Sequence, residues 1–326
     1  MPETSTQALI GAAILAGLLV VMSGIRAEKT DLTIADDVEY FASDAVATPG
    51  LQGISRNYPA MWKLVDQDTE IYLFGTFHLL PPDINWSSAK MLAAMAETSV
   101  TYLEADAASA SGQREVLSAV QRYGYNSPGV SLTATLGKQR AAKLAEVARR
   151  YGVELAVLEP LRPWLATLTL AVKAYQQAGL VSQSGAESTI IQIAQQQQDE
   201  IRYLESSVEQ IHALASLDEM ADYTSFDAEL AQFADFSREV LPLMEAWRSG
   251  DIATIELKLL TMLRNASPNS FDILFRKRNL NWRRQIKALM DGTGGYFIAV
   301  GVGHMVGDDS LIAMLRDDGY RVKRVQ

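Results

Sequence analysis

The sequence predicts an α/β fold: a mixed central β-sheet formed by the N- and C-terminal segments, with a large helical insertion. Two observations support this prediction. β–α–β patterns occur near both ends of the folded region, over residues 62–104 and again over residues 296–325. Between them, from about residue 137 to 290, apolar residues recur with a helical period and β-branched runs are few. A single sheet built from both ends and covered by a helical cap is the simplest arrangement.

The first β–α–β pattern opens with two apolar stretches, Trp62–Val65 and Ile71–Phe74, which we expect to pair as a hairpin around a short polar turn. One of two adjacent serines then caps a helix that ends near Glu97. A buried strand over residues 100–104 follows. These elements account for the N-terminal half of the predicted sheet.

The remaining elements follow from the same patterns. One apolar stretch inside the helical region, residues 201–205, is compatible with a further strand. The second β–α–β pattern predicts a strand over 296–300, a helix over 308–316 and a strand over 320–325. Helices of the insertion are expected over Lys138–Tyr151, Pro163–Ala178, Glu187–Gln198, Val208–Ala215, Tyr223–Ser249, Ile252–Leu263 and Phe271–Met290.

The N-terminal region differs in composition from the rest of the chain. Ala8–Met22 is an apolar run with the length of a signal-peptide core, and small residues follow it. We therefore expect a signal peptide or N-terminal anchor over residues 1–27, a polar linker over 28–57 and one domain over 58–326. No Lys or Arg precedes the apolar run, so an uncleaved anchor or an apolar helix stays open. Export to a periplasmic or extracellular space is expected, with membrane contact only through this segment.

The composition excludes several classes of function. A formal net charge of −10 over 326 residues argues against a nucleic-acid partner, because phosphate binding requires a basic surface. The chain has no cysteine, which rules out disulfides, thiol catalysis and cysteine-held metals. Any metal must therefore be held by histidine, carboxylate or amide groups.

Two of the three histidines end similar phrases that lie far apart in the sequence. His78 closes Leu-Phe-Gly-Thr-Phe-His, and His304 closes Val-Gly-Val-Gly-His, each after an apolar strand. Glu104 also stands at a predicted strand end. Ligands of open α/β sheets bind beyond the carboxyl ends of the strands, so these residues are expected to meet. Two imidazoles and a carboxylate form a plausible first shell for a divalent metal with open positions.

With these phrases in place, the sequence resembles the TraB/GumN family, which includes Tiki-type metal-dependent proteases. This family is distantly similar to erythromycin esterases and ChaN haem-binding proteins. The resemblance covers the chain from about Pro59 to its C-terminus, with two small departures at residues 185–187 and 204–206. The matching blocks are Leu73–His78, Tyr102–Glu104, Ser184–Glu187, Leu204–Gln210, Arg278–Asn279 and Gly301–Gly307.

The resemblance implies a site built from His78, Glu104 and His304, with Arg278 and Asn279 reaching in from the last long helix. It also implies that Glu205 either supports the residues of the site from behind or lies on the side where the substrate binds. GumN-like bacterial members are typically exported, in agreement with the N-terminal segment.

We therefore expect an exported hydrolase of the metal-dependent peptidase type, acting on a peptide or protein. His78, Glu104 and His304 would hold the cation, with zinc, manganese, cobalt and iron all compatible. Arg278 and Asn279 would stabilise the oxyanion. The general base is unassigned, with Glu205 as a candidate.

Two alternatives stay open. In a metal-independent esterase or amidase, His78 acts as the general base and Glu104 orients it. In a non-catalytic protein, the histidines bind haem, a metal or a peptide. The third histidine, His212, lies on a predicted helix without a matching partner and is interpreted as a surface residue.

Overall fold

The computed structural model describes residues 58–219 and 224–326. The expected signal peptide and linker lie outside the described residues. Within them, one six-stranded sheet has the order β4-β3-β5-β2-β1-β6. Its strands are β1 (Met61–Val65), β2 (Thr69–Thr76), β3 (Val100–Leu103), β4 (Glu200–Tyr203), β5 (Gly294–Gly301) and β6 (Val322–Arg324).

The sheet is mixed, as predicted. The four strands β4, β3, β5 and β2 are mutually parallel, so their carboxyl ends meet at one edge. β1 pairs antiparallel with β2, and the carboxylate of Asp66 accepts the N–H groups of Asp68 and Thr69 at 3.2 and 2.9 Å, which fixes the predicted hairpin turn. β6 pairs antiparallel with β1. The sheet thus joins the two ends of the folded region.

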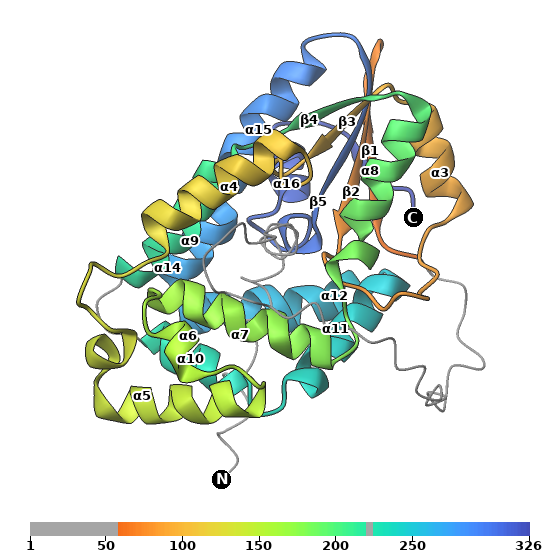
Figure 1. Cartoon of the computed structure of the whole chain (residues 1–326). Helices are drawn as coiled ribbons and strands as arrows, with labels where there is room; N and C mark the ends of the chain where they lie inside the picture. The colour runs from red at the N-terminus through yellow and green to blue at the C-terminus, as the bar shows by residue number, and fades with distance from the viewer. Residues whose placement is uncertain (1–57, 220–223) are drawn as a thin grey trace.

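Helices cover both faces of the sheet (Figure 1). α3 (Ala89–Ala96) joins β2 to β3, and α8 (Ala186–Gln197) leads into β4. Both connections step across the sheet in the same direction, so right-handed crossovers place them on one face. α15 (Lys277–Met290) brings the chain back to β5 and therefore lies on the opposite face, where α16 (Leu311–Asp317) packs against it.

Most of the other helices form the cap, which lies below the sheet in Figure 1, whereas α4 (Ala110–Tyr123) lies beside the sheet. Helix α7 (Pro163–Gln177) runs through the cap with most of its side chains buried. Two π-helical segments, η3 (Glu256–Thr261) and η4 (Asp272–Arg276), and three 3₁₀ turns, η1 (Ser182–Ser184), η2 (Ser216–Glu219) and η5 (Val302–His304), complete the described structure. The remaining helices are α5 (Leu132–Arg150), α6 (Leu155–Leu158), α9 (Ser207–Ala215), α10 (Thr224–Gln232), α11 (Phe236–Ser249), α12 (Ile252–Ile255), α13 (Met262–Ala266) and α14 (Pro268–Phe271).

The prediction of one helix over Tyr223–Ser249 is wrong, because α10 and α11 are separate. Their junction is stabilised by α5, where the hydroxyl of Tyr151 and the guanidinium of Arg150 donate to the carbonyl of Phe233 at 2.8 and 3.1 Å. Those bonds satisfy the end of α10, and Asp235 leaves the helical conformation with φ −143°. Helical periodicity alone did not show this break.

The insertion also contributes to the sheet. The stretch compatible with a strand is β4, which pairs in parallel with β3 and forms the sheet edge. A helix that was not predicted, α4, begins at the N-cap Ser109 and buries Val116, Ala119 and Val120. The cap is therefore helical except for one strand, and that strand brings Glu205 to the carboxyl edge of the sheet.

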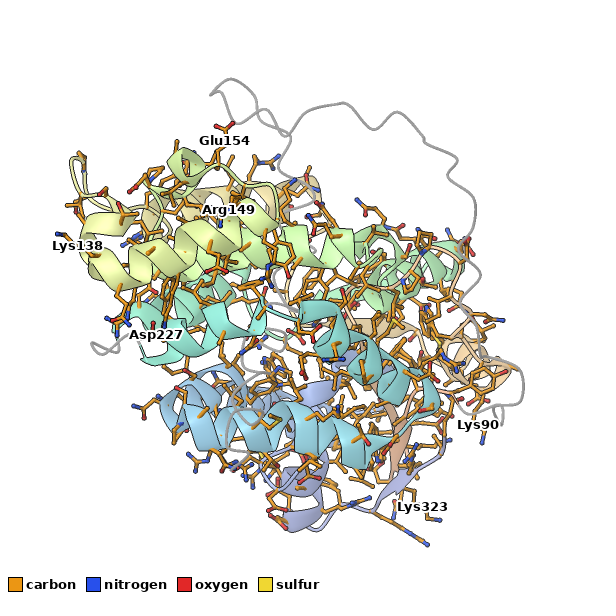
Figure 2. All side chains as sticks on the ribbon, turned by 90° about the horizontal axis from the view of Figure 1, so that it is seen from below. Lys90, Lys138, Arg149, Glu154, Asp227 and Lys323 are labelled. Carbon is orange, nitrogen blue, oxygen red and sulfur yellow. The ribbon has the colours of Figure 1, made fainter. Side chains whose placement is uncertain are left out.

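The exterior of the described part is charged and polar. Figure 2 shows exposed charged side chains around the periphery, among them Lys90, Lys138, Glu154 and Lys323. None of the helices within residues 58–219 and 224–326 has the length and apolar character needed to cross a membrane.

Candidate active site at the carboxyl edge of the sheet

Each of the four parallel strands is followed by one of the residues singled out in the sequence. Glu205 follows β4, Glu104 follows β3, His304 follows β5 through η5, and His78 follows β2. Because parallel strands end at the same edge, residues separated by up to 226 positions in the chain meet there. The side chains are enclosed: His78 is 6% exposed, Glu104 7% and His304 3%.

Gly301, the last residue of β5, marks the centre of this cluster. A Cβ atom there would lie 3.1 Å from Oε1 of Glu104, 3.2 Å from Nε2 of His78 and 3.8 Å from Cδ2 of His304. The backbone of Gly301 has φ −48° and ψ 134°, which other residues also adopt. Its lack of a side chain therefore serves the close approach of the three groups.

Glu104 is held as a carboxylate. Its Oε1 accepts the backbone N–H of Gly301 at 2.7 Å, and its Oε2 accepts from Arg278 at 2.6 Å and from Gln210 at 3.2 Å. Burial alone would raise the pKa of Glu104, but the positive charge of Arg278, followed by the two histidines and the Gly301 N–H, lowers it to about 2.

Arg278 is the cation around which the carboxylates gather. Its Nε and Nη2 donate to Glu205 at 3.1 and 2.6 Å, and its Nη1 donates to the Leu274 carbonyl at 3.1 Å. The guanidinium also lies over the Trp282 ring, 4.7 Å from its centroid. The π-helical segment η4 precedes α15, and such turns often occur at functional sites.

The pKa of Glu205 is shifted in the opposite direction from that of Glu104. Burial raises the pKa of its carboxyl, and the charge and hydrogen bonds of Arg278 oppose this rise without cancelling it. Arg278 thus holds two carboxylates at once, and Glu104 is the one that stays ionised most strongly. The Glu205–Arg278 ion pair thus links the end of β4 to α15, which lies on the face of the sheet opposite α3 and α8.

His304 is neutral, and its tautomer follows from its neighbours. The amide nitrogen of Asn279 donates to the Asp309 carbonyl at 2.8 Å, so the amide oxygen faces Nδ1 of His304 at 2.7 Å. Nδ1 therefore carries the proton, and Nε2 accepts from Arg278 at 3.1 Å. Burial, and then the charge of Arg278, lowers the pKa of His304 to about 3.

His78 is paired with a residue that had no predicted role. Its Nδ1 lies 2.7 Å from Oε1 of Glu187, in the first turn of α8. Burial would lower the pKa of His78, but the negative charge of the adjacent Glu187 carboxylate outweighs it and the pKa is raised. The start of α8 is drawn close by Gly185, where a Cβ would lie 2.0 Å from the carbonyl oxygen of His78.

The predicted residues are thus brought together, with two differences in placement. The orienting carboxylate of His78 is Glu187, and not Glu104 as the metal-independent alternative expected. Asn279 is 1% exposed and its amide oxygen contacts Nδ1 of His304, so in this structure its amide positions the imidazole, and its role toward an oxyanion stays a prediction. In the sequence, Glu187 was indicated only by its place at the end of the matching block Ser184–Glu187.

The predicted metal ligands have suitable donor atoms, but Arg278 already binds two of them. It donates to Oε2 of Glu104 and contacts Nε2 of His304. Within residues 58–219 and 224–326, no group of three acidic or histidine side chains is arranged to hold a metal ion. A metal on Glu104 and His304 would require the guanidinium to move.

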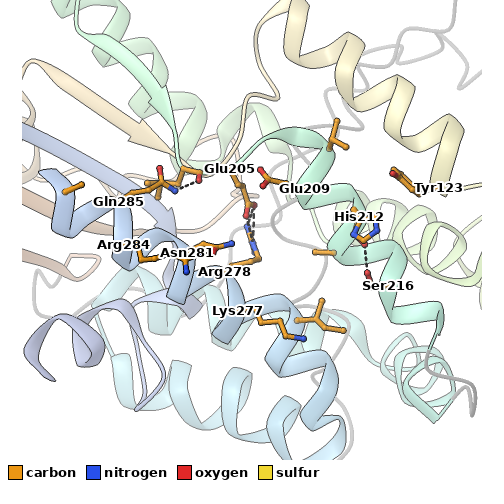
Figure 3. Close-up of a pocket in the computed structure, with 15 residues that line it drawn as sticks. Tyr123, Glu205, Glu209, His212, Ser216, Lys277, Arg278, Asn281, Arg284 and Gln285 are labelled. Carbon is orange, nitrogen blue, oxygen red and sulfur yellow. Dashed lines mark hydrogen bonds and ion pairs between the residues drawn. The ribbon is translucent and has the colours of Figure 1, made fainter. Parts of the chain in front are cut away.

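An open pocket of about 900 Å³ leads to this cluster between α9 and α15 (Figure 3). Glu205 and Arg278 line it, whereas His78, Glu104 and His304 do not. Arg278, which contacts both Glu104 and Nε2 of His304, therefore separates the pocket from these two groups. In Figure 3, dashed lines link Glu205, which lies between β4 and α9, to Arg278 of α15.

Comparisons with known proteins place the chain near one protein family. The model of the TraB/PrgY/gumN family matches residues 60–324. The uncharacterized protein YbaP of Escherichia coli (strain K12) is 23% identical over 266 residues, which cover 82% of this chain and 95% of YbaP. YbaP of Shigella flexneri matches with the same identity and coverage. No solved structure matches the chain significantly.

Proposed function

The chain belongs to the TraB/PrgY/gumN family, and from this membership and the site geometry we propose that it is a hydrolase of ester or amide bonds. The observation that carries the proposal is the contact of 2.7 Å between Glu187 and Nδ1 of His78, which leaves Nε2 facing Gly301 and Glu104. A base whose second nitrogen is held by a carboxylate is the usual arrangement of a histidine that activates water.

In this proposal the Nε2 atom of His78 takes a proton from water as the water oxygen bonds to the acyl carbon. The carbonyl oxygen becomes an oxyanion, and Arg278 is the nearby cation that can stabilise it. When the acyl–oxygen or acyl–nitrogen bond breaks, His78 returns the proton to the leaving atom. Glu187 stabilises the imidazolium between the two transfers.

A substrate that enters through this pocket meets the Glu205–Arg278 pair first, because these two residues line the pocket and His78 does not. Arg278 is also held by Glu104, so in this proposal Glu205 is the partner that moves when a substrate enters. The raised pKa of Glu205 favours this movement, since its protonated form is held less tightly by Arg278.

The proposal is tested with the full chain and a panel of fluorogenic esters and N-acylated peptides. His78→Ala should lower hydrolysis by at least about a hundredfold. Arg238→Gln changes an arginine whose side chain is 80% exposed and should leave the rate unchanged. A His78→Ala protein that retains the wild-type rate, or a wild-type chain inactive on every substrate of the panel, would contradict the proposal.

One observation favours a second candidate, a metal-dependent peptidase. Both His78 and His304 have Nδ1 held by a side-chain oxygen, from Glu187 and Asn279, which is common for histidines that bind a metal through Nε2. With Glu104, they would supply two nitrogens and one carboxylate. A bound cation would polarise the acyl carbonyl and activate water.

Elemental analysis separates the two candidates. A metal-dependent enzyme should be purified with about one equivalent of metal, lose activity with chelator and lose the metal in His304→Ala. Chelator-resistant activity that still needs His78 would support the metal-independent hydrolase. His304→Ala with unchanged metal content would contradict the metal candidate.

We also propose that the protein is exported through its N-terminal segment. The support is the apolar run Ala8–Met22 with small residues after it. Sequencing the N-terminus of the protein purified from its native cells would show whether the segment is removed. An intact N-terminus on a cytosolic protein would contradict export.

A further inference from the structure

The pocket that leads to the cluster is a groove between two helices. Its α9 wall carries Glu209 and His212, and its α15 wall carries Lys277, Asn281 and Arg284 (Figure 3). Apolar and aromatic side chains also line the groove, among them Tyr123, Leu204, Val208, Ile273 and Ala288. His212, interpreted from the sequence as a surface residue, is exposed and packs edge-on against Tyr123 with ring centroids 5.3 Å apart.

Most charges in the groove are already neutralised. Arg278 binds two carboxylates, and Lys277 lies 3.0 Å from Asp272. Glu209 caps α9, where its Oε2 accepts the N–H and the hydroxyl of Ser206, each at 2.8 Å.

Arg284 is different. Its contact is the side-chain oxygen of Asn281, and it has no acidic partner among the residues that the structure describes. An exposed guanidinium without a carboxylate, at the wall of a groove in a chain of net charge −10, is available to a ligand anion. Asn281 lies one helical turn before it and orients it.

The spacing along α15 sets a length. Arg278 and Arg284 are six positions apart, which at about 1.5 Å per residue is about 9 Å along the helix axis. An extended peptide advances about 3.3–3.6 Å per residue. Both side chains line the groove, so along the helix axis an anion bound at Arg284 would be displaced by two to three residue lengths from an acyl group at Arg278.

We propose that the α9–α15 groove binds an acyl substrate that carries a carboxylate about two to three residue lengths from the bond to be cleaved, and that Arg284 binds this carboxylate. The inference rests on the proposed hydrolytic function, because the length is counted from Arg278. A singly charged carboxylate fits better than a phosphate, since Arg284 supplies one positive charge and the other two cations of the groove, Lys277 and Arg278, already have acidic partners.

The test measures binding and does not depend on turnover. The probes are rhodamine-labelled, alanine-rich octapeptides with blocked ends that carry one Glu, one Gln or one phosphoserine, titrated by fluorescence anisotropy against the full-length His78→Ala chain. The Glu peptide should bind about fivefold more tightly than the Gln peptide, as for a partly exposed ion pair. Arg284→Gln should reduce this preference to less than about twofold, whereas Arg238→Gln should leave it intact.

Three results would overturn the proposal: equal binding of the Glu and Gln peptides, a preference that survives Arg284→Gln, or tighter binding of the phosphoserine peptide. Absence of binding by all three probes would also overturn it. Failure of the hydrolase proposal is seen separately, as a wild-type chain that binds the Glu peptide and does not cleave any substrate of the panel.

Discussion

Replacing Arg278 by Gln should destabilise the protein strongly at neutral pH and less in acid. The substitution leaves Glu104 and Glu205 enclosed without their shared cation. Removing one partner of a buried ion pair typically costs about 3–5 kcal/mol. The pKa of Glu104 gives an independent magnitude, because it is lowered from 4.5 to about 2. A pKa difference of one corresponds to about 1.4 kcal/mol, so the ionised form of Glu104 contributes on the order of 3 kcal/mol to the stability of the fold.

The sign of the pH dependence follows from the same carboxylate. In the wild-type chain the pKa of Glu104 is lower in the folded state, so its contribution is present above about pH 4.5 and is lost as the pH falls toward 2. Without Arg278, burial dominates and the pKa of Glu104 rises. Protonation then relieves the buried charge, and the deficit of the variant relative to wild type should shrink as the pH is lowered from 7 to 4.5.

Urea unfolding at pH 7 and at pH 4.5, followed by circular dichroism, measures both effects. Arg238→Gln removes the same charge from an exposed position and should change the unfolding free energy by less than about 0.5 kcal/mol. A loss below about 1 kcal/mol for Arg278→Gln, or an equal loss at the two pH values, would refute the assignment of Arg278 as the required counter-charge. If Arg278→Gln does not fold at pH 7, Arg278→Gln combined with Glu104→Gln should restore folding.

Three further predictions concern the surroundings of the histidines. Gly301→Ala should lower hydrolysis by about a hundredfold, because its Cβ would crowd Glu104 and His78, whereas Gly292→Ala, at an exposed position outside the site, should leave the rate unchanged; equal rates would contradict the crowding. Glu187→Gln should lower the rate by about a hundredfold or more and move the acid limb of the pH–rate profile to lower pH, because Glu187 raises the pKa of His78; an unmoved limb would exclude this pairing. Asn279→Ala should abolish the exclusive Nδ1–H tautomer of His304, observed by ¹⁵N NMR of the imidazole, and an unchanged spectrum would show that Arg278 alone sets the tautomer.

The strand–glycine–histidine phrases could be found in the sequence because they are local. An apolar run that ends in glycine and histidine predicts both a strand and the place of the histidine at its carboxyl end, without knowledge of the partner strand. The same reasoning placed Glu104. The hairpin, the terminal β–α–β patterns and most helices were predictable for the same reason, since their signals lie within a few residues of each other.

The contacts of those groups could not be predicted, because they depend on where distant elements pack. Glu187 reaches His78 only because α8 starts against the backbone of that histidine, 109 positions away in the chain. The break between α10 and α11 likewise depends on side chains of α5 that bind its carbonyls.

The sequence by itself therefore determined the family, the α/β class and the chemical groups of the site, since these depend on residue type and short spacing. Only the tertiary structure decided which groups face each other. It placed β5 between β2 and β3, set Glu187 behind His78 and Asn279 behind His304, and brought Arg278 across the sheet to Glu104 and Glu205. The physical reason is that strand order and helix crossing result from burial of the whole apolar core, which no short segment specifies.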